Sequence, residues 1–272
     1  MYYLRVWATF FRNSVIREMM FKGNFLIQIV TRAFWFFAQI AMFKVIFVKV
    51  TAINGWSEDQ YFAFMATGML INGIVETFFM PNCANLSEQI RTGRLDFALV
   101  KPLNTQFLAS LERINLAMLS QVLLAVALLV TSLVRIGLPI APLSVLAYRG
   151  FVLFGVLFFY SLMIVMACTS IFMGRNQGLY DFWFYITVFA RYPRSIYDGR
   201  DSARFEAGEM LQFGFSWVVP ILLVVTVPAR IIVGTLHQPV FAAVAGIAAC
   251  AGLLISKVVF SWSLNHYRSA SS

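Results

Sequence analysis

Glu76 is the residue of this sequence most suited to chemistry in an apolar environment. It lies in the apolar run 61–80, and Gly68 and Asn72 precede it at intervals of four residues, so that the three positions share one face of a helix. An ionised carboxylate without a partner inside a membrane is costly, so we expect Glu76 to be paired, protonated or hydrated. Two interpretations stay open for this face: a helix-packing contact of Glu76 with Asn72 and a neighbouring Ser or Arg, or the wall of a path through the membrane.

The sequence contains no motif for catalysis, metal binding or nucleotide binding. The two histidines are too few for an HExxH zinc helix or a histidine-rich set of ligands. The GxSxG and Walker A (GxxxxGK[ST]) patterns are absent, and the three cysteines show no CxxC spacing. We therefore expect no catalytic residues, no metal site and no cofactor in this chain, and we do not expect it to be an enzyme.

The composition indicates an integral membrane protein. Hydrophobic residues make up 60% of the 272 residues and charged residues only 12%, whereas soluble domains carry about 25% charged residues. The formal net charge is +9, but the basic residues are scattered among loops and helix ends. This distribution favours contact with anionic membrane lipid over nucleic-acid binding.

Long apolar runs separated by charged turns predict an all-α, polytopic membrane protein with six transmembrane helices in a single domain, 1–272. Residues 1–22 mix aromatic and basic side chains and predict a helix that lies in the membrane interface. Five spans follow from hydropathy alone, at about 25–48, 61–80, 114–134, 146–173 and 240–262. Basic residues in the segment 81–113 place this segment, and with it both termini, on the cytoplasmic side.

Two topologies are open for the fifth span. In one, residues 213–233 cross the membrane and 179–196 lies in the inner interface, which hydropathy and the arginine count favour. In the other, 179–196 is the fifth span, and the region 197–234 contains a re-entrant hairpin broken by Pro220 and Pro228. Both versions have six crossings.

The segment 90–104, IRTGRLDFALVKPLN, lies between the second and third apolar runs and contains a glycine, then Leu-Asp, then Leu-x-Lys-Pro-Leu. It resembles the permease subunits of ABC-2 exporters, and more narrowly their six-span branch. The ARYPRSIY sequence is also similar to this family, although the acidic run DGRDSARFEAGE that follows it replaces the usual turn with Pro and Trp. The family pattern favours the re-entrant version of the fifth span.

The resemblance implies that the chain is the permease half of an ATP-driven exporter. The region 81–113 would carry a cytosolic coupling helix that docks on a separate ATPase subunit, which would bind ATP and Mg²⁺. A second permease subunit, the same chain or a related one, would complete the translocation path, lined in part by Asn72 and Glu76. The location would be the cytoplasmic membrane of a bacterium or archaeon.

Five residues of the coupling region are expected to transmit force to the spans. Gly93 would permit a tight helix start, Leu95 would be an apolar knob for a groove of the ATPase, and Asp96 would accept hydrogen bonds at a helix N-terminus or pair with a base on the partner. Lys101 and Pro102 complete the set. Local loop structure is the alternative explanation for these residue types.

Two other functions remain possible on sequence grounds. An ion-gradient-driven secondary carrier would transport without an ATPase, but it usually shows several intramembrane carboxylates or inverted repeats, and neither is evident here. A non-transporting membrane scaffold for a cytosolic complex would keep the docking segment and have no water-filled path.

Overall fold

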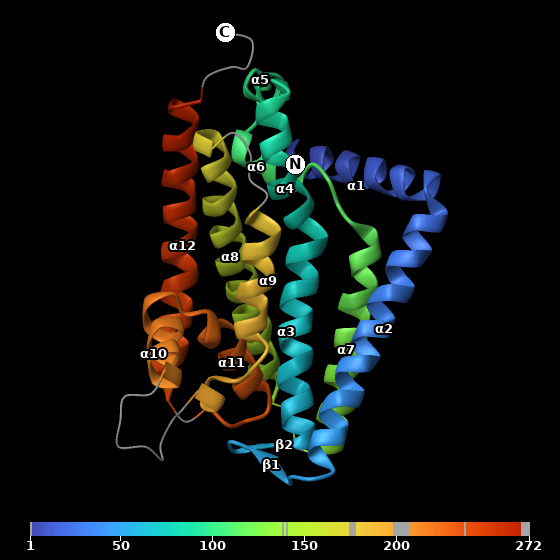
Figure 1. Cartoon of the computed structure of the whole chain (residues 1–272), viewed down its shortest axis with the longest axis vertical. Helices are drawn as coiled ribbons and strands as arrows, with labels where there is room; N and C mark the ends of the chain where they lie inside the picture. The colour runs from blue at the N-terminus through green and yellow to red at the C-terminus, as the bar shows by residue number, and fades with distance from the viewer. Residues whose placement is uncertain are drawn as a thin grey trace.

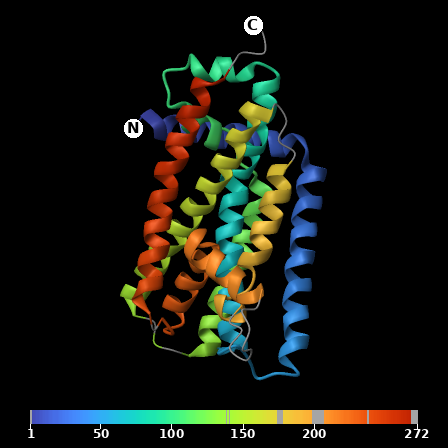
Figure 2. The same cartoon turned by 60° about the vertical axis from the view of Figure 1, so that its left-hand side comes forward.

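The computed structural model of the chain describes residues 2–137, 139, 141–173, 178–197, 207–236 and 238–267. Within these residues, five helices are long and apolar enough to cross a membrane. They are α2 (Lys22–Phe47), α3 (Glu58–Phe78), α7 (Leu119–Ile136, preceded by the 3₁₀ turn η1, Leu116–Met118), α8 (Pro142–Met173) and α12 (Pro239–Asn265). Figures 1 and 2 show these helices running along the long axis of the molecule. The prediction of an all-α, polytopic membrane protein is confirmed.

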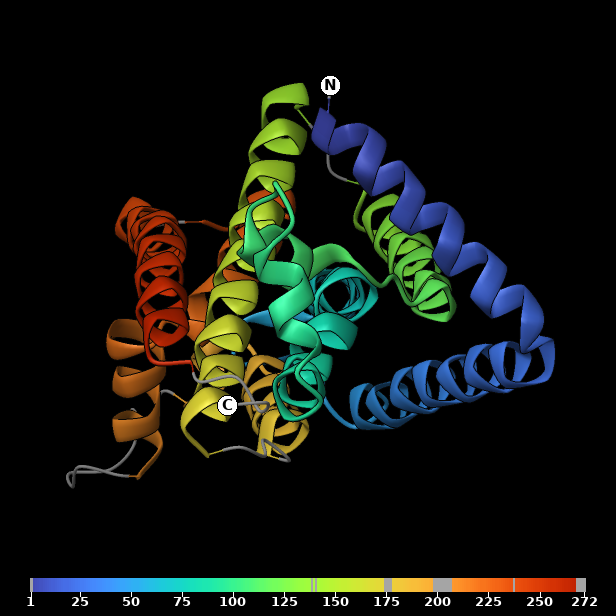
Figure 3. The same ribbon diagram turned by 90° about the horizontal axis from the view of Figure 1, so that it is seen from above.

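The helix α1 (Tyr2–Met20) lies across one end of this bundle. The chain breaks at Phe21, whose backbone leaves the helical region, and α2 then begins. Figures 1 and 3 show α1 nearly perpendicular to α2 and passing over the end of α7. This orientation agrees with the interfacial helix expected for residues 1–22.

A two-residue hairpin closes the opposite end between α2 and α3. Its strands, β1 (Ala52–Ile53) and β2 (Trp56–Ser57), pair antiparallel. Asn54 and Gly55 between them both have positive φ, of 44° and 82°, which is the conformation of a type I′ turn and the reason for the Asn-Gly pair. Below, this end is called the hairpin end, and the end where α1 lies is called the α1 end.

Helix α3 lies at the centre of the bundle, and most of its side chains are buried, whereas few side chains of α2 are fully buried. Close packing of α3 against α7 depends on Gly73, where an added Cβ would lie 2.9 Å from Cγ2 of Val122. Small residues allow such close approach between membrane helices.

Three short helices form a cap at the α1 end: α4 (Met80–Arg91), α5 (Arg94–Leu99) and α6 (Thr105–Leu111). Figure 1 places α5 at the extreme end of the molecule, near the last turn of α12. The region 81–113 is thus folded into helices rather than being an open loop.

The ambiguous region folds into α9 (Gly178–Ala190), the 3₁₀ turn η2 (Arg194–Tyr197), α10 (Ala207–Phe213), the π-helical η3 (Gly214–Val218) and α11 (Ile221–Ile232). In Figure 1, α9 runs beside α8 toward the hairpin end, whereas α10 and α11 both lie in the half of the molecule nearer that end. The two parts of the second apolar run are bent by 81°, so 213–233 does not form one straight crossing. The arrangement agrees with the re-entrant version; residues 198–206 of the predicted 197–234 region lie outside the described residues.

The two prolines of this region behave differently. Pro220 is the residue before α11 and lies at the bend, as expected. Pro228 lies inside α11, which continues through it, so the prediction that it breaks the run is wrong. Pro228 has no N–H for the carbonyl of Val224, and Gly155 of α8 lies against this oxygen, where a Cβ would be 3.1 Å away. Close packing by a glycine therefore covers the carbonyl that the proline leaves without a helical donor.

Arg194 of the ARYPRSIY sequence connects the bent region of η3 and α11 to its surroundings. Its Nε donates to Oγ of Ser216 at 3.1 Å, and its guanidinium lies 4.5 Å from the ring centre of Phe241 on α12. The neighbouring Ser195 accepts a hydrogen bond from Nε1 of Trp56 in the β-hairpin at 3.2 Å. The motif thus has a structural role at the hairpin end.

Candidate functional site

Glu76 of α3 contacts both α2 and α9. Its Oε2 lies 3.3 Å from Nη1 of Arg32 on α2, and its Oε1 accepts a hydrogen bond of 3.1 Å from Nε1 of Trp183 on α9. The side chain of Glu76 is 17% exposed and that of Arg32 is 40% exposed. The structure therefore shows Glu76 in an ion pair, which is one of the three states expected for it. The partner is an arginine, as the helix-packing interpretation allowed.

The predicted stripe of Gly68, Asn72 and Glu76 contacts different neighbours along its length. A Cβ at Gly68 would lie 3.4 Å from Cγ1 of Val225, so this position packs against α11. Asn72 has a buried Oδ1 without a hydrogen-bond partner among the described residues. A buried amide oxygen without a donor is destabilising, so Asn72 is the position of the stripe that packing does not explain.

The coupling segment begins at Gly93, which precedes α5 with a φ of 69°. Only glycine adopts this left-handed conformation readily, so the expected tight helix start is present. Asp96 lies in the first turn of α5, where a carboxylate interacts favourably with the helix dipole. Its carboxylate also affects Tyr267 beyond the end of α12: burial and the nearby Asp96 charge together raise the pKa of Tyr267.

Leu95 does not have the predicted role. Its exposed fraction is 0%, and it belongs to the hydrophobic core with Leu86 and Ile90 of α4. A fully buried side chain cannot enter a groove of another protein, so the prediction of an apolar knob at Leu95 is wrong. The helix turns this residue inward and its neighbours outward, because positions 95 and 97 are 200° apart around a helix with about 3.6 residues per turn.

The exposed side of the segment is apolar and flanked by basic residues. Phe97 is 70% exposed and Val100 is 81% exposed. We call this surface the docking face; it consists of these two residues together with the exposed Arg94, Leu99, Lys101 and Pro102. Large apolar side chains that point into water at the end of a membrane protein are typical of a protein contact.

Hydrogen bonds fix the cap to the spans. Nδ2 and Oδ1 of Asn82 in α4 each bond the backbone of Arg113, both at 2.7 Å. The hydroxyl of Tyr160 on α8 bonds Oγ of Ser110 at 2.8 Å and accepts from Nε2 of Gln106 at 3.1 Å in α6. These contacts join α4 to the linker before η1 and join α6 to α8.

Comparison with known families decides between the interpretations of this arrangement. A sequence model of the family described as "ABC-2 family transporter protein" matches residues 33–271, most of the chain. The chain belongs to this family. It is a multi-pass membrane protein and a permease component of an ABC transporter, and the resemblance inferred from residues 90–104 is confirmed. Comparison with curated proteins and with solved structures found no match.

Family membership gives no support to the secondary carrier or the membrane scaffold. ABC-2 permeases are normally non-catalytic and work with an ATP-binding cassette partner. Within the described part of this permease, no three His, Cys, Asp or Glu side chains lie together in a way that would hold a metal ion.

Sequence reasoning missed the two partners of Glu76 in this ABC-2 permease. Arg32 is the only basic residue in the body of the first apolar run, and that isolation was an available signal for a partner of opposite charge. Trp183 gave no such signal among the many aromatic residues. The sequence also gave no sign that Leu95 lies on the buried side of α5 and that Phe97 and Val100 lie on its exposed side.

Proposed function

We propose that the protein is the membrane half of an ATP-driven exporter and that its docking face receives a separate ATPase subunit. The observation that carries this proposal is the exposure of Phe97 and Val100 beside the fully buried Leu95. An apolar surface of this kind, anchored from within, suits the transmission of force better than a solvated loop does. ATP and Mg²⁺ would be bound by the partner, and the α1 end, with both termini, would face the cytoplasm of a bacterium or archaeon.

The residues predicted for coupling keep roles in this proposal, with one change. Gly93 starts the helix, Asp96 links it to Tyr267 after the last span, and Lys101 and Pro102 belong to the docking face itself. Leu95 anchors α5 from within. ATP-driven closure of two ATPase subunits would displace the docking face as a rigid body, and the hydrogen bonds of Asn82 and Tyr160 would carry this displacement to the spans.

We place the translocation path beside the Arg32, Glu76 and Asn72 positions. The support for this assignment is the buried Oδ1 of Asn72, which has no partner among the described residues, and the ion pair between α2 and α3 on a partly exposed side of the bundle. A second permease subunit, identical or related, would close the path from the other side.

Purification of the tagged protein from its own membranes in mild detergent, followed by mass spectrometry, tests this proposal. The wild-type protein should retain an ATPase with a Walker A motif at near-equal stoichiometry, and the double variant Phe97→Asp, Val100→Asp should lose it. The matched control is Val50→Asp, which places a charge at an exposed apolar residue beyond α2 at the hairpin end. Retention of the ATPase by the double variant, or its equal loss in the control, would overturn the assignment.

A further inference from the structure

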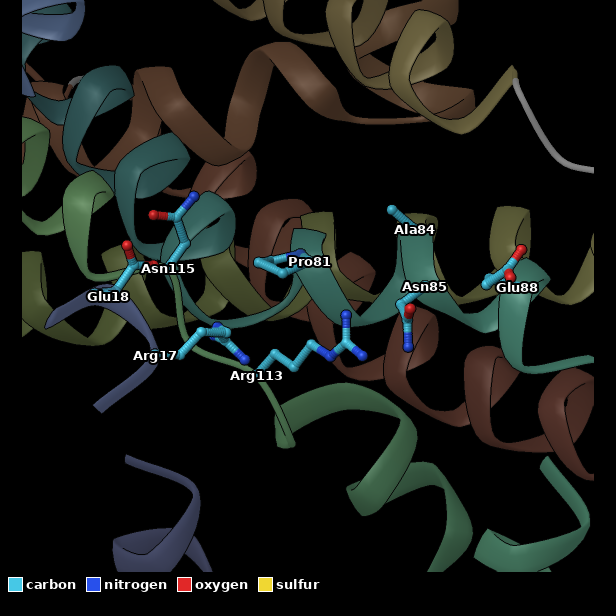
Figure 4. A pocket seen from close by; sticks show the side chains of 8 residues that line it. All are labelled: Arg17, Glu18, Pro81, Ala84, Asn85, Glu88, Arg113 and Asn115. Atoms are coloured by element: carbon cyan, nitrogen blue, oxygen red, sulfur yellow. The ribbon is translucent and has the colours of Figure 1, made fainter. Parts of the chain in front are cut away.

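A polar pocket of about 400 Å³ lies at the α1 end, between α1, α4 and the linker that precedes η1. Two arginines, two glutamates and two asparagines line it, and Pro81 and Ala84 form its apolar wall (Figure 4). Its size lies within the range of small-ligand sites. The pocket is separate from the docking face and from the Glu76 ion pair.

The walls of the pocket are fixed before any ligand binds. Ser14 of α1 is fully buried, and its Oγ accepts a hydrogen bond from the backbone N–H of Ile114 at 3.0 Å. Nη2 of Arg17 donates to the carbonyl of the same residue at 3.2 Å. Asn82 holds the backbone of Arg113 from the other side. Binding of a ligand therefore requires little additional loss of conformational entropy from the walls of the pocket.

The middle of the pocket is cationic. Within the described part of the chain, the guanidinium of Arg113 has neither a hydrogen-bond partner nor an ion pair, although its backbone is fully engaged. Figure 4 shows it extended toward Asn85, with Arg17 nearby on α1. Two guanidinium groups and an amide in this arrangement suit the oxygens of a phosphate.

One end of the pocket carries a negative charge instead. Figure 4 shows the carboxylate of Glu18 and the amide of Asn115 at this end, and Glu88 lies at the other end, beyond Asn85. Oδ1 of Asn115 is buried and has no hydrogen-bond partner among the described residues. A carboxylate and a free carbonyl oxygen suit a group that brings several N–H donors and a positive charge, such as a primary ammonium.

We propose that this pocket binds the headgroup of a phospholipid that carries both a phosphate and a primary ammonium, as in phosphatidylethanolamine. Arg113 and Arg17 hold the phosphate, and Glu18 and Asn115 hold the ammonium. The source is the membrane, because α1 has the mixed aromatic and basic composition of an interfacial helix and lies across the ends of α2 and α7 (Figure 3). The lipid would brace α1 against α4, beside the cap that carries the docking face.

Native mass spectrometry of the delipidated protein in detergent tests this proposal with three added lipids that share acyl chains. Phosphatidylethanolamine should be retained more than phosphatidylcholine, whose trimethylammonium has no N–H donor, and more than phosphatidylglycerol, which has no cation. Arg113→Gln should lower retention of phosphatidylethanolamine about ten- to hundredfold, the loss expected for one charged hydrogen bond. Glu18→Gln should lower it to the level of phosphatidylglycerol and leave phosphatidylglycerol unchanged.

The control is Arg12→Gln, which removes an equal charge from an exposed position of the same helix and should leave retention unchanged. Equal retention of the three lipids by the wild-type protein, or an equal effect of Arg12→Gln and Arg113→Gln, would overturn the proposal. Soluble phosphoethanolamine distinguishes the source: it should not displace the lipid at equal concentration, and displacement would overturn the assignment to a membrane lipid. Among the described residues, neither Glu18 nor Arg113 contributes a side chain to an internal hydrogen bond, so both variants should fold.

Discussion

Removal of the Arg32 charge should destabilise the protein because it leaves the Glu76 carboxylate with Trp183 as its remaining partner. Removal of one partner from a fully buried ion pair lowers the free energy of unfolding by about 3–5 kcal/mol. Removal of one partner from an exposed pair lowers it by about 0–1 kcal/mol. Glu76 is 17% exposed and Arg32 is 40% exposed, which places this pair between the two limits. We expect Arg32→Gln to lower the free energy of unfolding by about 2 kcal/mol.

The reverse substitution should be milder. Glu76→Gln keeps an amide oxygen for Nε1 of Trp183, and the long side chain of Arg32 can reach the interface when its partner is neutral. We expect Glu76→Gln to lower the free energy of unfolding by about 1 kcal/mol. The double variant Arg32→Gln, Glu76→Gln should also lose about 1 kcal/mol, rather than the roughly 3 kcal/mol of additive effects, because it contains no unpaired charge.

Thermal unfolding of the four proteins in one detergent measures these differences. For a chain of this size, a change of 1 kcal/mol shifts the melting temperature by roughly 2–4 °C, so Arg32→Gln should lower it by roughly 4–8 °C. The matched control is Arg135→Gln, whose pair with Asp59 has an N–O distance of 4.0 Å and a 61% exposed arginine side chain; its effect should be below about 0.5 kcal/mol. Additive effects in the double variant, or equal effects of Arg32→Gln and Arg135→Gln, would refute the reasoning.

Three further predictions concern packing and backbone conformation. Leu95→Asp should prevent recovery of a monodisperse protein in size-exclusion chromatography, because it buries a charge in the core, whereas Phe97→Asp should elute like the wild type; equal behaviour of the two would contradict the burial of Leu95. Gly155→Ala should lower the free energy of unfolding by about 1–3 kcal/mol, since its Cβ would lie 2.9 Å from Cδ1 of Ile71. The control Gly150→Ala, whose Cβ would have nothing within 4 Å, should not lower the melting temperature. Equal melting temperatures of the two variants would contradict the close packing of α8 at Gly155. Gly93→Ala should cost about 1–2 kcal/mol because of its positive φ, and Gly93→Asn less; an alanine variant as stable as the wild type would contradict the left-handed start of α5.

The helices of the bundle could be predicted from sequence because hydropathy over a length of about 20 residues depends little on tertiary contacts. The ion pairing of Glu76 was predictable for a similar reason, since the cost of an unpaired charge in a membrane holds in any fold. The isolation of Arg32 in its apolar run was a signal for an oppositely charged partner, but its pairing with Glu76 and the contact of Trp183 depend on how α2 and α9 pack against α3.

The orientation of α5 could not be predicted, for a different reason. Both faces of the six-residue helix carry apolar side chains, Leu95 on one and Phe97 on the other, so periodicity gives no preference for the buried face. The left-handed Gly93 and the contacts of α4 set the rotation of the helix. Pro228 was misjudged because the helix interior usually excludes proline, whereas α11 continues through it, with Gly155 of α8 packed closely against the carbonyl oxygen of Val224.

The central claim is that the docking face is the contact surface of a separate ATPase. A photo-reactive amino acid in place of Val100, which is more exposed than Phe97 and Leu99 of that face, tests it most directly in intact membranes, with the same substitution at Val50 as the control. We expect a crosslink from position 100, and none from position 50, to a protein that carries a Walker A motif. Crosslinks from position 100 only to lipid, or only to proteins without an ATP-binding motif, would contradict it.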